Sequence, residues 1–209
     1  AVGRFPVVHS DDARTMVDKT IAYAQNANAG AWQNTIMFMG DDGNNNLHMK
    51  DVNETAETIM TAYPNYLVKK VMWDAYTRIG TSTGFTYPEV SSVIKQQQAQ
   101  GALIMDYAGH GSEIQISHEA VLRITDFQNF TNAHLPLWIT ASCDIMPFDG
   151  TIATIGEEAM LNKKGGSVAF WGTTRTVYAS YNKHINTAFM KHVLSFKDGK
   201  PISLGEAQR

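Results

Sequence analysis

The feature that most constrains the fold of this chain is the alternation of short, continuous apolar runs with longer stretches that repeat apolar residues at helical spacing. Continuous apolar runs are typical of strands buried on both faces of a sheet. We expect strands at residues 35–39, 66–73, 102–108, 137–141 and 166–171, and helices at residues 10–26, 47–63, 88–100, 126–132, 155–161 and 181–193. Residues 74–87 are rich in Gly, Ser and Thr and indicate a loop. The alternation predicts an α/β fold with a mostly parallel sheet flanked by helices on both faces.

The composition is typical of one globular domain. With 209 residues, 44% of them hydrophobic, the chain is too apolar for a disordered protein, and its net charge of −3 gives no sign of a nucleic-acid partner. It has no apolar run of the length that spans a bilayer. The chain begins without a methionine or a signal peptide and ends inside a helix-like phrase at 203–209. We therefore expect residues 1–209 to be one domain, with truncated ends, of a longer protein.

Two residues of potential chemical importance directly follow predicted strands. His110 comes after the strand at 102–108, and Cys143, the single cysteine, comes after the strand at 137–141. Parallel strands end at the same edge of a sheet, where α/β proteins bind their ligands. An imidazole at that edge can take the proton of a thiol and leave a nucleophilic thiolate. The spacing alone leaves open that the cysteine is a small core residue and that the histidine, between two glycines, is structural.

Other motifs narrow the chemistry. The chain has no HExxH zinc motif and no GxSxG, GxGxxG or Walker A phrase, which excludes the common serine hydrolase, dinucleotide-binding and phosphate-loop sites. The histidine precedes the cysteine, the reverse of the papain order, and the caspase phrase QAC[RQG]G is missing. Of the remaining histidines, only His48 follows a predicted strand-end turn, at 40–43, and so is placed to approach the sheet edge. The others are typical of surface or helix positions: His9, His118, His134, His184 and His192.

Two phrases make the sequence similar to a known family. Residues 107–113 read Tyr-Ala-Gly-His-Gly-Ser-Glu, and residues 140–144 read Thr-Ala-Ser-Cys-Asp. They resemble the His-Gly and Ala/Ser-Cys motifs of clan CD cysteine peptidases, and within that clan the gingipain family, C25. Further similar phrases lie at residues 2–5, 155–159 and 168–175. The resemblance implies a caspase/gingipain-like fold over nearly the whole chain.

The resemblance also implies roles for individual residues. Cys143 matches the family's nucleophile and His110 its catalytic histidine, which together form a His-Cys dyad. The backbone amides of Gly111 and Cys143 match the donors of the oxyanion hole. An acid that orients the histidine corresponds to Asp41 or Asp42, and we favour Asp42 slightly. In the alternative, both acids only shape a turn.

Three further phrases, at residues 40–43, 72–76 and 143–150, resemble the gingipain-like domain of the type IX secretion sortases of Bacteroidetes (PorU-like) more than the digestive gingipains. This resemblance implies a peptidase/transpeptidase that removes C-terminal secretion signals from cargo and attaches the cargo to anionic lipopolysaccharide. It would cross the inner membrane and work at the outer-membrane surface of a Gram-negative bacterium, with other proteins of the attachment complex. The alternatives are a secreted gingipain-like endopeptidase, a catalytically silent binding module of the same fold and, more weakly, a metal-dependent hydrolase.

The substrate pocket is where the sequence departs from gingipains that cleave after Arg or Lys. Those enzymes need an acid to pair with the basic P1 residue, the one before the scissile bond. The segment at 173–178 matches their pocket wall but carries a cation, Arg175, and an aromatic, Tyr178. We expect a pocket that disfavours basic P1 residues and accepts small or polar ones. In the alternative, Arg175 is a surface residue packed on Tyr178.

No metal or cofactor is predicted. Some gingipain-family domains hold structural calcium, so the resemblance leaves one alternative open. Asp41, Asp42 and Glu54 offer carboxylate oxygens of the kind that Ca²⁺ binds.

Overall fold

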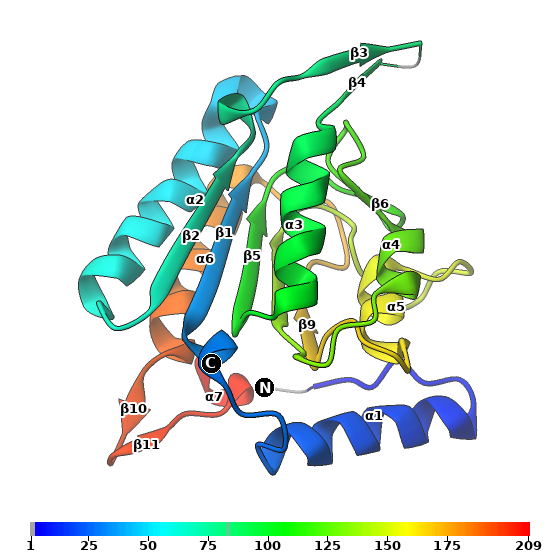
Figure 1. Cartoon of the computed structure of the whole chain (residues 1–209), viewed down its shortest axis with the longest axis vertical. Helices are drawn as coiled ribbons and strands as arrows, with labels where there is room; N and C mark the ends of the chain where they lie inside the picture. Colours follow the sequence, from blue (N-terminus) through cyan, green and yellow to red (C-terminus); the bar gives the residue numbers. More distant parts are fainter. Residues whose placement is uncertain (1–2, 83) are drawn as a thin grey trace.

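A five-stranded, all-parallel sheet forms the centre of the molecule (Figure 1). The computed structural model describes residues 3–82 and 84–209. The strands lie in the order β2-β1-β5-β8-β9. Their bounds are β1 Thr35–Gly40, β2 Leu67–Met72, β5 Ile104–Ala108, β8 Leu137–Ala141 and β9 Ala169–Trp171. The predicted α/β fold with a parallel sheet is confirmed.

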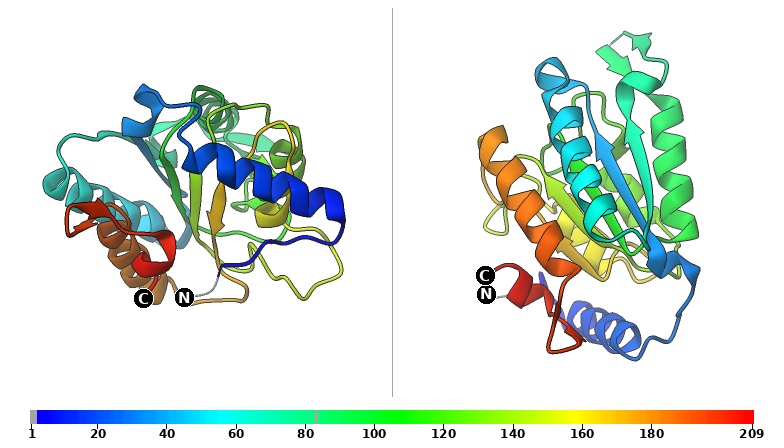
Figure 2. Two further views of the ribbon diagram at one scale, coloured as in Figure 1. Left: turned by 90° about the horizontal axis from the view of Figure 1, so that it is seen from below. Right: turned by 90° about the vertical axis from the view of Figure 1, so that its left-hand side faces the viewer.

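Helices cover both faces of this sheet (Figure 2). On one face lie α2 (Gly43–Ala62) and α6 (Ala179–Val193), and on the other lie α3 (Pro88–Gln100), α4 (Ile124–Asn129) and α5 (Ile155–Leu161). Helix α1 (Ser10–Ala24) lies across the lower end of the sheet in Figure 1, and the short α7 (Leu204–Ala207) packs near α6. Among the described residues, no helix is both long enough and apolar enough to cross a membrane.

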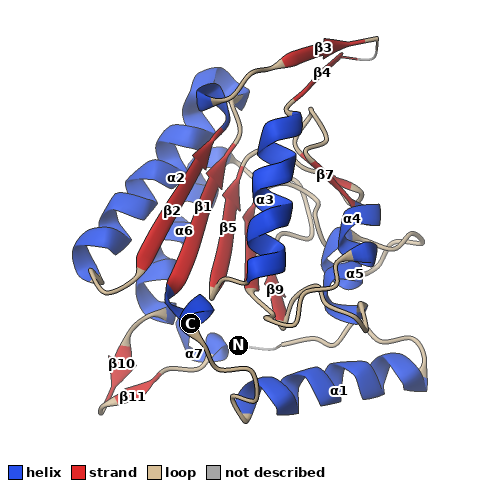
Figure 3. Cartoon of the chain, viewed as in Figure 1, coloured by secondary structure: helices blue, strands red, loops and turns tan. Residues whose placement is uncertain are grey.

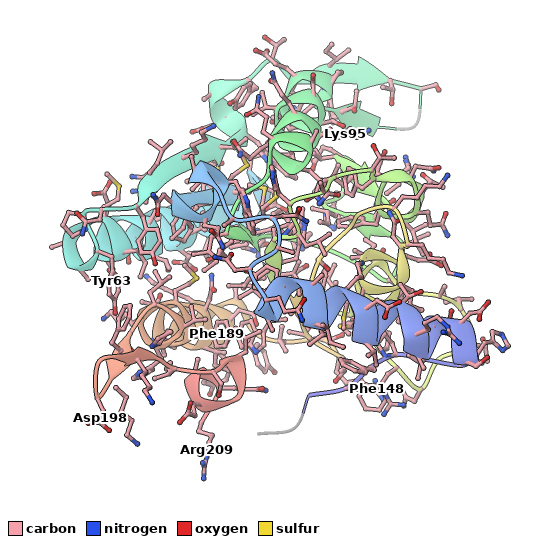
Figure 4. All side chains as sticks on the ribbon, turned by 60° about the horizontal axis from the view of Figure 1, so that its bottom comes forward. Tyr63, Lys95, Phe148, Phe189, Asp198 and Arg209 are labelled. Carbon is pink, nitrogen blue, oxygen red and sulfur yellow. The ribbon has the colours of Figure 1, made fainter. Side chains whose placement is uncertain are left out.

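The central strands are mostly apolar because both of their faces are buried; Asp106 of β5 and Thr140 of β8 are buried polar exceptions. Side chains alternate between the two faces of a strand, so Phe38 packs in the cluster under α2 and α6 while Met39 packs in the cluster under α3. Phe189 of α6, labelled in Figure 4, stacks on Trp171 of the edge strand with ring centroids 4.6 Å apart. This packing fixes the position of the helices relative to the carboxyl edge of the sheet.

The structure contains elements that the sequence pattern did not reveal. Residues 74–87, predicted as a loop, include an antiparallel hairpin that projects beyond the carboxyl edge of the sheet (Figure 3). Its strands of three residues are too short and too exposed to show a period of two. One residue of this loop, 83, and the start of the similar phrase at 2–5 lie outside the described residues. The small added strands are β3 Ile79–Thr81, β4 Gly84–Thr86, β6 Gln115–Ile116, β7 Leu122–Arg123, β10 Phe196–Lys197 and β11 Lys200–Pro201, and two 3₁₀ turns span Ala31–Asn34 and Trp73–Ala75.

The strand order reverses between β1 and β5. From β1 the chain moves outward to β2 and then crosses back over β1 to add β5, β8 and β9 on the other side. The loops that leave β1 and β5 therefore diverge, and such a switch point at the carboxyl edge is where open α/β sheets bind ligands. Gly40 pairs with Ala108, and Ala108 pairs with Ala141, so the three loops that follow these strands start at the same level.

Candidate active site

His110 and Cys143 occupy equivalent positions on neighbouring strands. Each lies two residues beyond a member of the Ala108–Ala141 pair. The N–H of Gly109 donates to the carbonyl oxygen of Ala141 at 3.3 Å, which continues the ladder past the strand ends. Both side chains line one pocket of about 100 Å³ at this edge. The structure thus brings together the two residues that the strand pattern placed at the same edge.

The imidazole of His110 is packed between two other histidine rings. The ring of His118 stacks on it with centroids 4.1 Å apart and an interplanar angle of 10°, and the ring of His48 meets it edge-on at 4.8 Å. The backbone of Gly43 lies so close that a Cβ there would come within 2.6 Å of Cδ2 of His110. The hydrogen bonds of His110 within the described ranges involve only its backbone. Its ring nitrogens are therefore free to exchange a proton.

Asp41 is buried beneath this histidine and accepts hydrogen bonds from several directions. Its carboxylate accepts from the backbone N–H of His110 at 2.7 Å and from the hydroxyl of Tyr107 at 3.0 Å. It also accepts from the backbone N–H of Gly43 at 3.2 Å and makes a short contact with Nδ1 of His48. Burial raises the pKa of Asp41, but the contacts with His48, His110 and Tyr107 outweigh it and lower that pKa below its usual value. Asp41 is therefore a charged carboxylate that fixes the backbone of His110.

Asp42, the acid that we favoured slightly, has different partners. It accepts a hydrogen bond of 2.7 Å from the hydroxyl of Tyr87 and lies 3.6 Å from the guanidinium of Arg78. These contacts tie the turn to the start of α3 and to the base of the β3–β4 hairpin. Of the two acids, Asp41 is the one that touches His110. The sequence alone does not show which of two adjacent acids in the same turn contacts the histidine.

An unusual turn carries His48 into the site. Asn44, Asn45 and Asn46 all have left-handed backbone angles, with φ of 54°, 56° and 63°. Asparagine tolerates this conformation better than most residues do. The amide nitrogen of Asn44 lies 3.1 Å from Nε2 of His48, whose other ring nitrogen contacts Asp41. The expected approach of His48 to the sheet edge is confirmed, and the run of asparagines is the sequence signal for the turn.

The loop that carries Cys143 is held by the segment at 173–177. Sγ of Cys143 lies 3.6 Å from the carbonyl oxygen of Val177, and the N–H of Asp144 lies 3.4 Å from the carbonyl oxygen of Arg175. Asp144 has a positive φ of 48°, a conformation that non-glycine residues adopt at a cost. The half-buried thiol of Cys143 therefore lies at a sharp turn that the segment at 173–177 holds in place.

Gly111 packs directly against the cysteine loop. A Cβ on Gly111 would lie 2.3 Å from Oγ of Ser142 and 2.5 Å from Cδ1 of Ile145, so only glycine fits. In the bridge between Gly111 and Ile116, the N–H of Ser112 donates to Gln115 and the N–H of Ser117 donates to His110. The N–H of Gly111 itself has no acceptor among the described residues. In the described part of the chain, the N–H of Cys143 also lacks an acceptor. Both amides that the family resemblance assigns to the oxyanion hole are unengaged.

Two residues that we expected in the wall of the substrate pocket, Arg175 and Tyr178, lie apart from the cavity that His110 and Cys143 share. Arg175 and Tyr178 do not line the pocket beside Cys143, although Val177 from the same segment does. Arg175 is held by the exposed carboxylate of Asp149, with Nη1 3.1 Å from Oδ1. Tyr178 precedes α6, is 76% exposed and lies against Tyr181 rather than Arg175. Arg175 is a surface residue, as in the alternative, but its observed side-chain partner is Asp149 rather than Tyr178.

The acids considered for calcium do not form a calcium site. Asp41 is occupied by the donors described above, Asp42 contacts a tyrosine and an arginine, and Glu54 pairs with Lys183 at 2.5 Å. Over residues 3–82 and 84–209, no three His, Cys, Asp or Glu side chains are grouped so that they could hold a metal ion. The residues present therefore do not fit a bound calcium ion.

The fold and the site define a class of protein: an α/β domain with a gingipain-like parallel sheet and with a histidine and a cysteine on adjacent strand ends. The sequence model described as Peptidase family C25 matches residues 1–209. The chain belongs to this family, and it is a gingipain-like cysteine peptidase domain.

Solved structures support the fold assignment. The crystal structure of the Arg-specific cysteine proteinase gingipain R (RGPB) matches with a TM-score of 0.71 and 18% identity, over 91% of this chain and 43% of that one. The complex of the Porphyromonas gingivalis RgpB pro- and mature domains matches with a TM-score of 0.72 and 18% identity, over 93% and 45%. A third structure, described as a protease, gives 0.71 and 15%, over 87% and 38%. The chain spans less than half the length of these proteins, and no curated protein sequence matches it.

Proposed function

We propose that this domain cleaves peptide bonds with Cys143 as the nucleophile and His110 as the general base and acid. The observation that carries the proposal is the shared pocket at the switch point of the sheet, lined by both residues. The unengaged ring nitrogens of His110 and the unengaged amide of Gly111 supply the two other parts that acyl transfer needs.

The reaction follows from these positions. His110 takes the proton of the Cys143 thiol, and the thiolate attacks the carbonyl carbon of the scissile bond. The amides of Gly111 and Cys143 donate to the oxygen on which negative charge develops. His110 then gives its proton to the leaving amine as the C–N bond breaks, which leaves a thioester on Cys143. A second nucleophile, deprotonated by His110, attacks the thioester and releases the acyl group.

The surroundings of His110 favour a neutral imidazole as the resting base. Burial lowers the pKa of His110, the charge of Asp41 raises it, and the neighbouring rings of His118 and His48 lower it further, so the net shift is downward. A base must be unprotonated to accept the thiol proton, and a lowered pKa keeps it so at neutral pH. Asp41 and His48 act here as positioning residues, because they hold the backbone and the ring face of His110.

The finer proposal concerns the second nucleophile. We propose a type IX secretion sortase, which removes the C-terminal signal of secreted cargo and passes the cargo to an amine of anionic lipopolysaccharide at the outer-membrane surface. Its support is the sequence of the phrases at 40–43, 72–76 and 143–150, two of which form the Asp41 turn and the cysteine loop. If water is the second nucleophile, the domain is an endopeptidase instead.

The experiment uses a cargo protein that carries its signal, incubated with the protein that contains this domain, with and without an added amine acceptor. We expect signal removal by the parent protein, loss of at least a thousandfold in Cys143→Ala and His110→Gln, and no change in His192→Gln, an exposed histidine of α6. Mass spectrometry of the product separates the two activities: an amine adduct indicates a transpeptidase and a free carboxylate indicates a peptidase. Signal removal that survives in Cys143→Ala would overturn the catalytic proposal and leave a silent module.

A further inference from the structure

The β3–β4 hairpin carries an aromatic side chain on the face that looks toward the candidate active site. Gly80 pairs with Phe85 across the hairpin, so these two residues share one face and Ile79 lies on the other. The guanidinium of Arg78 lies 4.1 Å from the centroid of the Phe85 ring and 3.6 Å from the carboxylate of Asp42. Because Arg78 touches both, the Phe85 ring lies on the side of the hairpin that faces the turn after β1.

The rest of the domain leaves this ring largely uncovered. Phe85 is 53% exposed, and Arg78 lies over only one face of its ring. The residue opposite, Gly80, has no side chain, and even a Cβ there would come no closer than 4.0 Å to the ring. The hairpin forms a sheet of two strands, which alone is marginally stable in water. An aromatic side chain on such a face pairs well with an aliphatic side chain of a neighbouring extended segment.

The strand order places the hairpin on the leaving-group side of the reaction. In the proposed mechanism His110 protonates the leaving amine, so the peptide segment after the scissile bond begins beside His110. Cys143 follows β8 and His110 follows β5, and the next strands in the sheet are β1 and then β2, which leads into the hairpin (Figure 1). A peptide that passes Cys143 and then His110 therefore runs toward β1 and β2.

The distance across the sheet edge is short for an extended peptide. Neighbouring strands lie about 4.8 Å apart, so β2 is roughly 10 Å from β5. An extended peptide advances about 3.3 Å per residue and spans this distance with about three residues. A leaving segment of eight residues is therefore long enough to pass over β1 and β2 and to reach the hairpin.

We propose that the Phe85 face of the β3–β4 hairpin binds the substrate segment on the C-terminal side of the scissile bond, in extended conformation, through an apolar side chain of that segment. The face is continuous with the candidate active site, because Asp42, which contacts Arg78, adjoins the acid that accepts from the backbone N–H of His110. The inference rests on the proposed function, since His110 marks the leaving side only if it protonates the leaving amine.

The test uses three sets of peptides with a common N-terminal side, assayed with the protein that contains this domain. The residue before the scissile bond is an equimolar mixture of amino acids, so that no preference there is assumed. The leaving side has two residues in the first set, eight residues with Leu or Val at alternate positions in the second, and eight residues of Ser and Gly in the third. We expect kcat/KM for the second set to exceed that for the other two at least tenfold, chiefly through a lower KM. In Phe85→Ser this advantage should fall below twofold, while the rate with the first set stays that of the parent.

Two other exposed apolar residues supply matched controls. Ile79→Ser changes the other face of the same hairpin, where Ile79 is 48% exposed. Phe196→Ser changes an exposed aromatic residue of the β10–β11 hairpin, at the opposite end of the molecule in Figure 1. Both variants should keep the tenfold advantage of the parent.

The outcomes separate this inference from the proposed function. A parent protein that does not favour the second set, a Phe85→Ser variant that keeps the advantage, or an Ile79→Ser variant that loses it as well overturns the inference and leaves the cysteine peptidase intact. A parent protein that cleaves none of the peptides and whose thiol is not labelled by peptidyl acyloxymethyl ketones overturns the proposed function, and this inference with it.

Discussion

Replacing Asp41 with asparagine removes one negative charge from the base of the site with almost no change of shape. The carboxylate receives two donors at each oxygen: the N–H of Gly43 and Nδ1 of His48 at one, the N–H of His110 and the hydroxyl of Tyr107 at the other. Asparagine keeps one acceptor oxygen, and its amide group faces the other two donors. One or two hydrogen bonds to a charged group are therefore lost.

The magnitude follows from this count. A hydrogen bond to a charged group contributes about 1.5–3 kcal/mol, so Asp41→Asn should reduce the free energy of unfolding by about 2–5 kcal/mol at pH 7. The pKa of Asp41 is lowered in the folded state, so the stabilisation by this carboxylate is complete above its unfolded pKa of about 3.9. It is lost as the pH falls through the lower folded value. The difference between parent and variant should therefore shrink below about pH 4.

The assay is urea unfolding of both proteins at pH 7 and at several lower pH values, together with kcat/KM at pH 7. The matched control is Asp42→Asn, because Asp42 is half-buried and contacts Tyr87 and Arg78 rather than His110. We expect the control to cost about 1 kcal/mol, as for one ordinary hydrogen bond, and to retain most of the activity. If Asp42→Asn impaired catalysis more than Asp41→Asn did, the assignment of Asp41 as the positioning acid would be refuted.

Three further substitutions test other parts of the account. Gly111→Ala should lower kcat/KM at least a hundredfold, since the new Cβ would lie 2.3 Å from Oγ of Ser142 and would displace the backbone N–H of Gly111, the proposed oxyanion donor; near-parent activity would contradict the close packing. Phe189→Ala should reduce the free energy of unfolding by about 3–5 kcal/mol in a urea titration, because the ring is buried against the edge strand; a cost below 1 kcal/mol would contradict this. His118→Gln should raise the pKa of His110 in an NMR titration, because the stacked ring buries it and adds like charge; an unchanged or lower pKa would contradict the stacking.

The positions of the central strands, and of the reactive residues that follow them, were predictable because a strand buried on both faces appears in the sequence as a continuous apolar run. Those at 35–39 and 137–141 match β1 and β8 to within one residue, and the turns that follow them carry Asp41 and Cys143. The pattern also placed His110 at the same edge, since parallel strands end together. The strand pattern therefore placed His110 and Cys143 at one sheet edge independently of the resemblance to gingipains.

The side-chain partners within the site were not predictable. His118 has the sequence context of a surface residue, yet its ring stacks on His110 because a small hairpin, β6–β7, folds the chain back beside the histidine. Residues of α6 line the cavity beside Cys143, and the periodicity of a helix does not show how close the helix comes to a sheet edge. One signal was present: Asn186 lies on the same helix as the buried Phe189 and Met190, and a polar residue buried with such neighbours usually has a structural or functional role.

The most direct test of the central claim is an intact-mass measurement during turnover of a slowly deacylated peptide ester by the protein that contains this domain. The account predicts one acyl group per chain, attached to Cys143, the single thiol of these 209 residues. The adduct should form at least a hundredfold more slowly in His110→Gln and should be absent in Cys143→Ala. Turnover without an adduct, or an adduct that persists in Cys143→Ala, would contradict acyl transfer through this thiol.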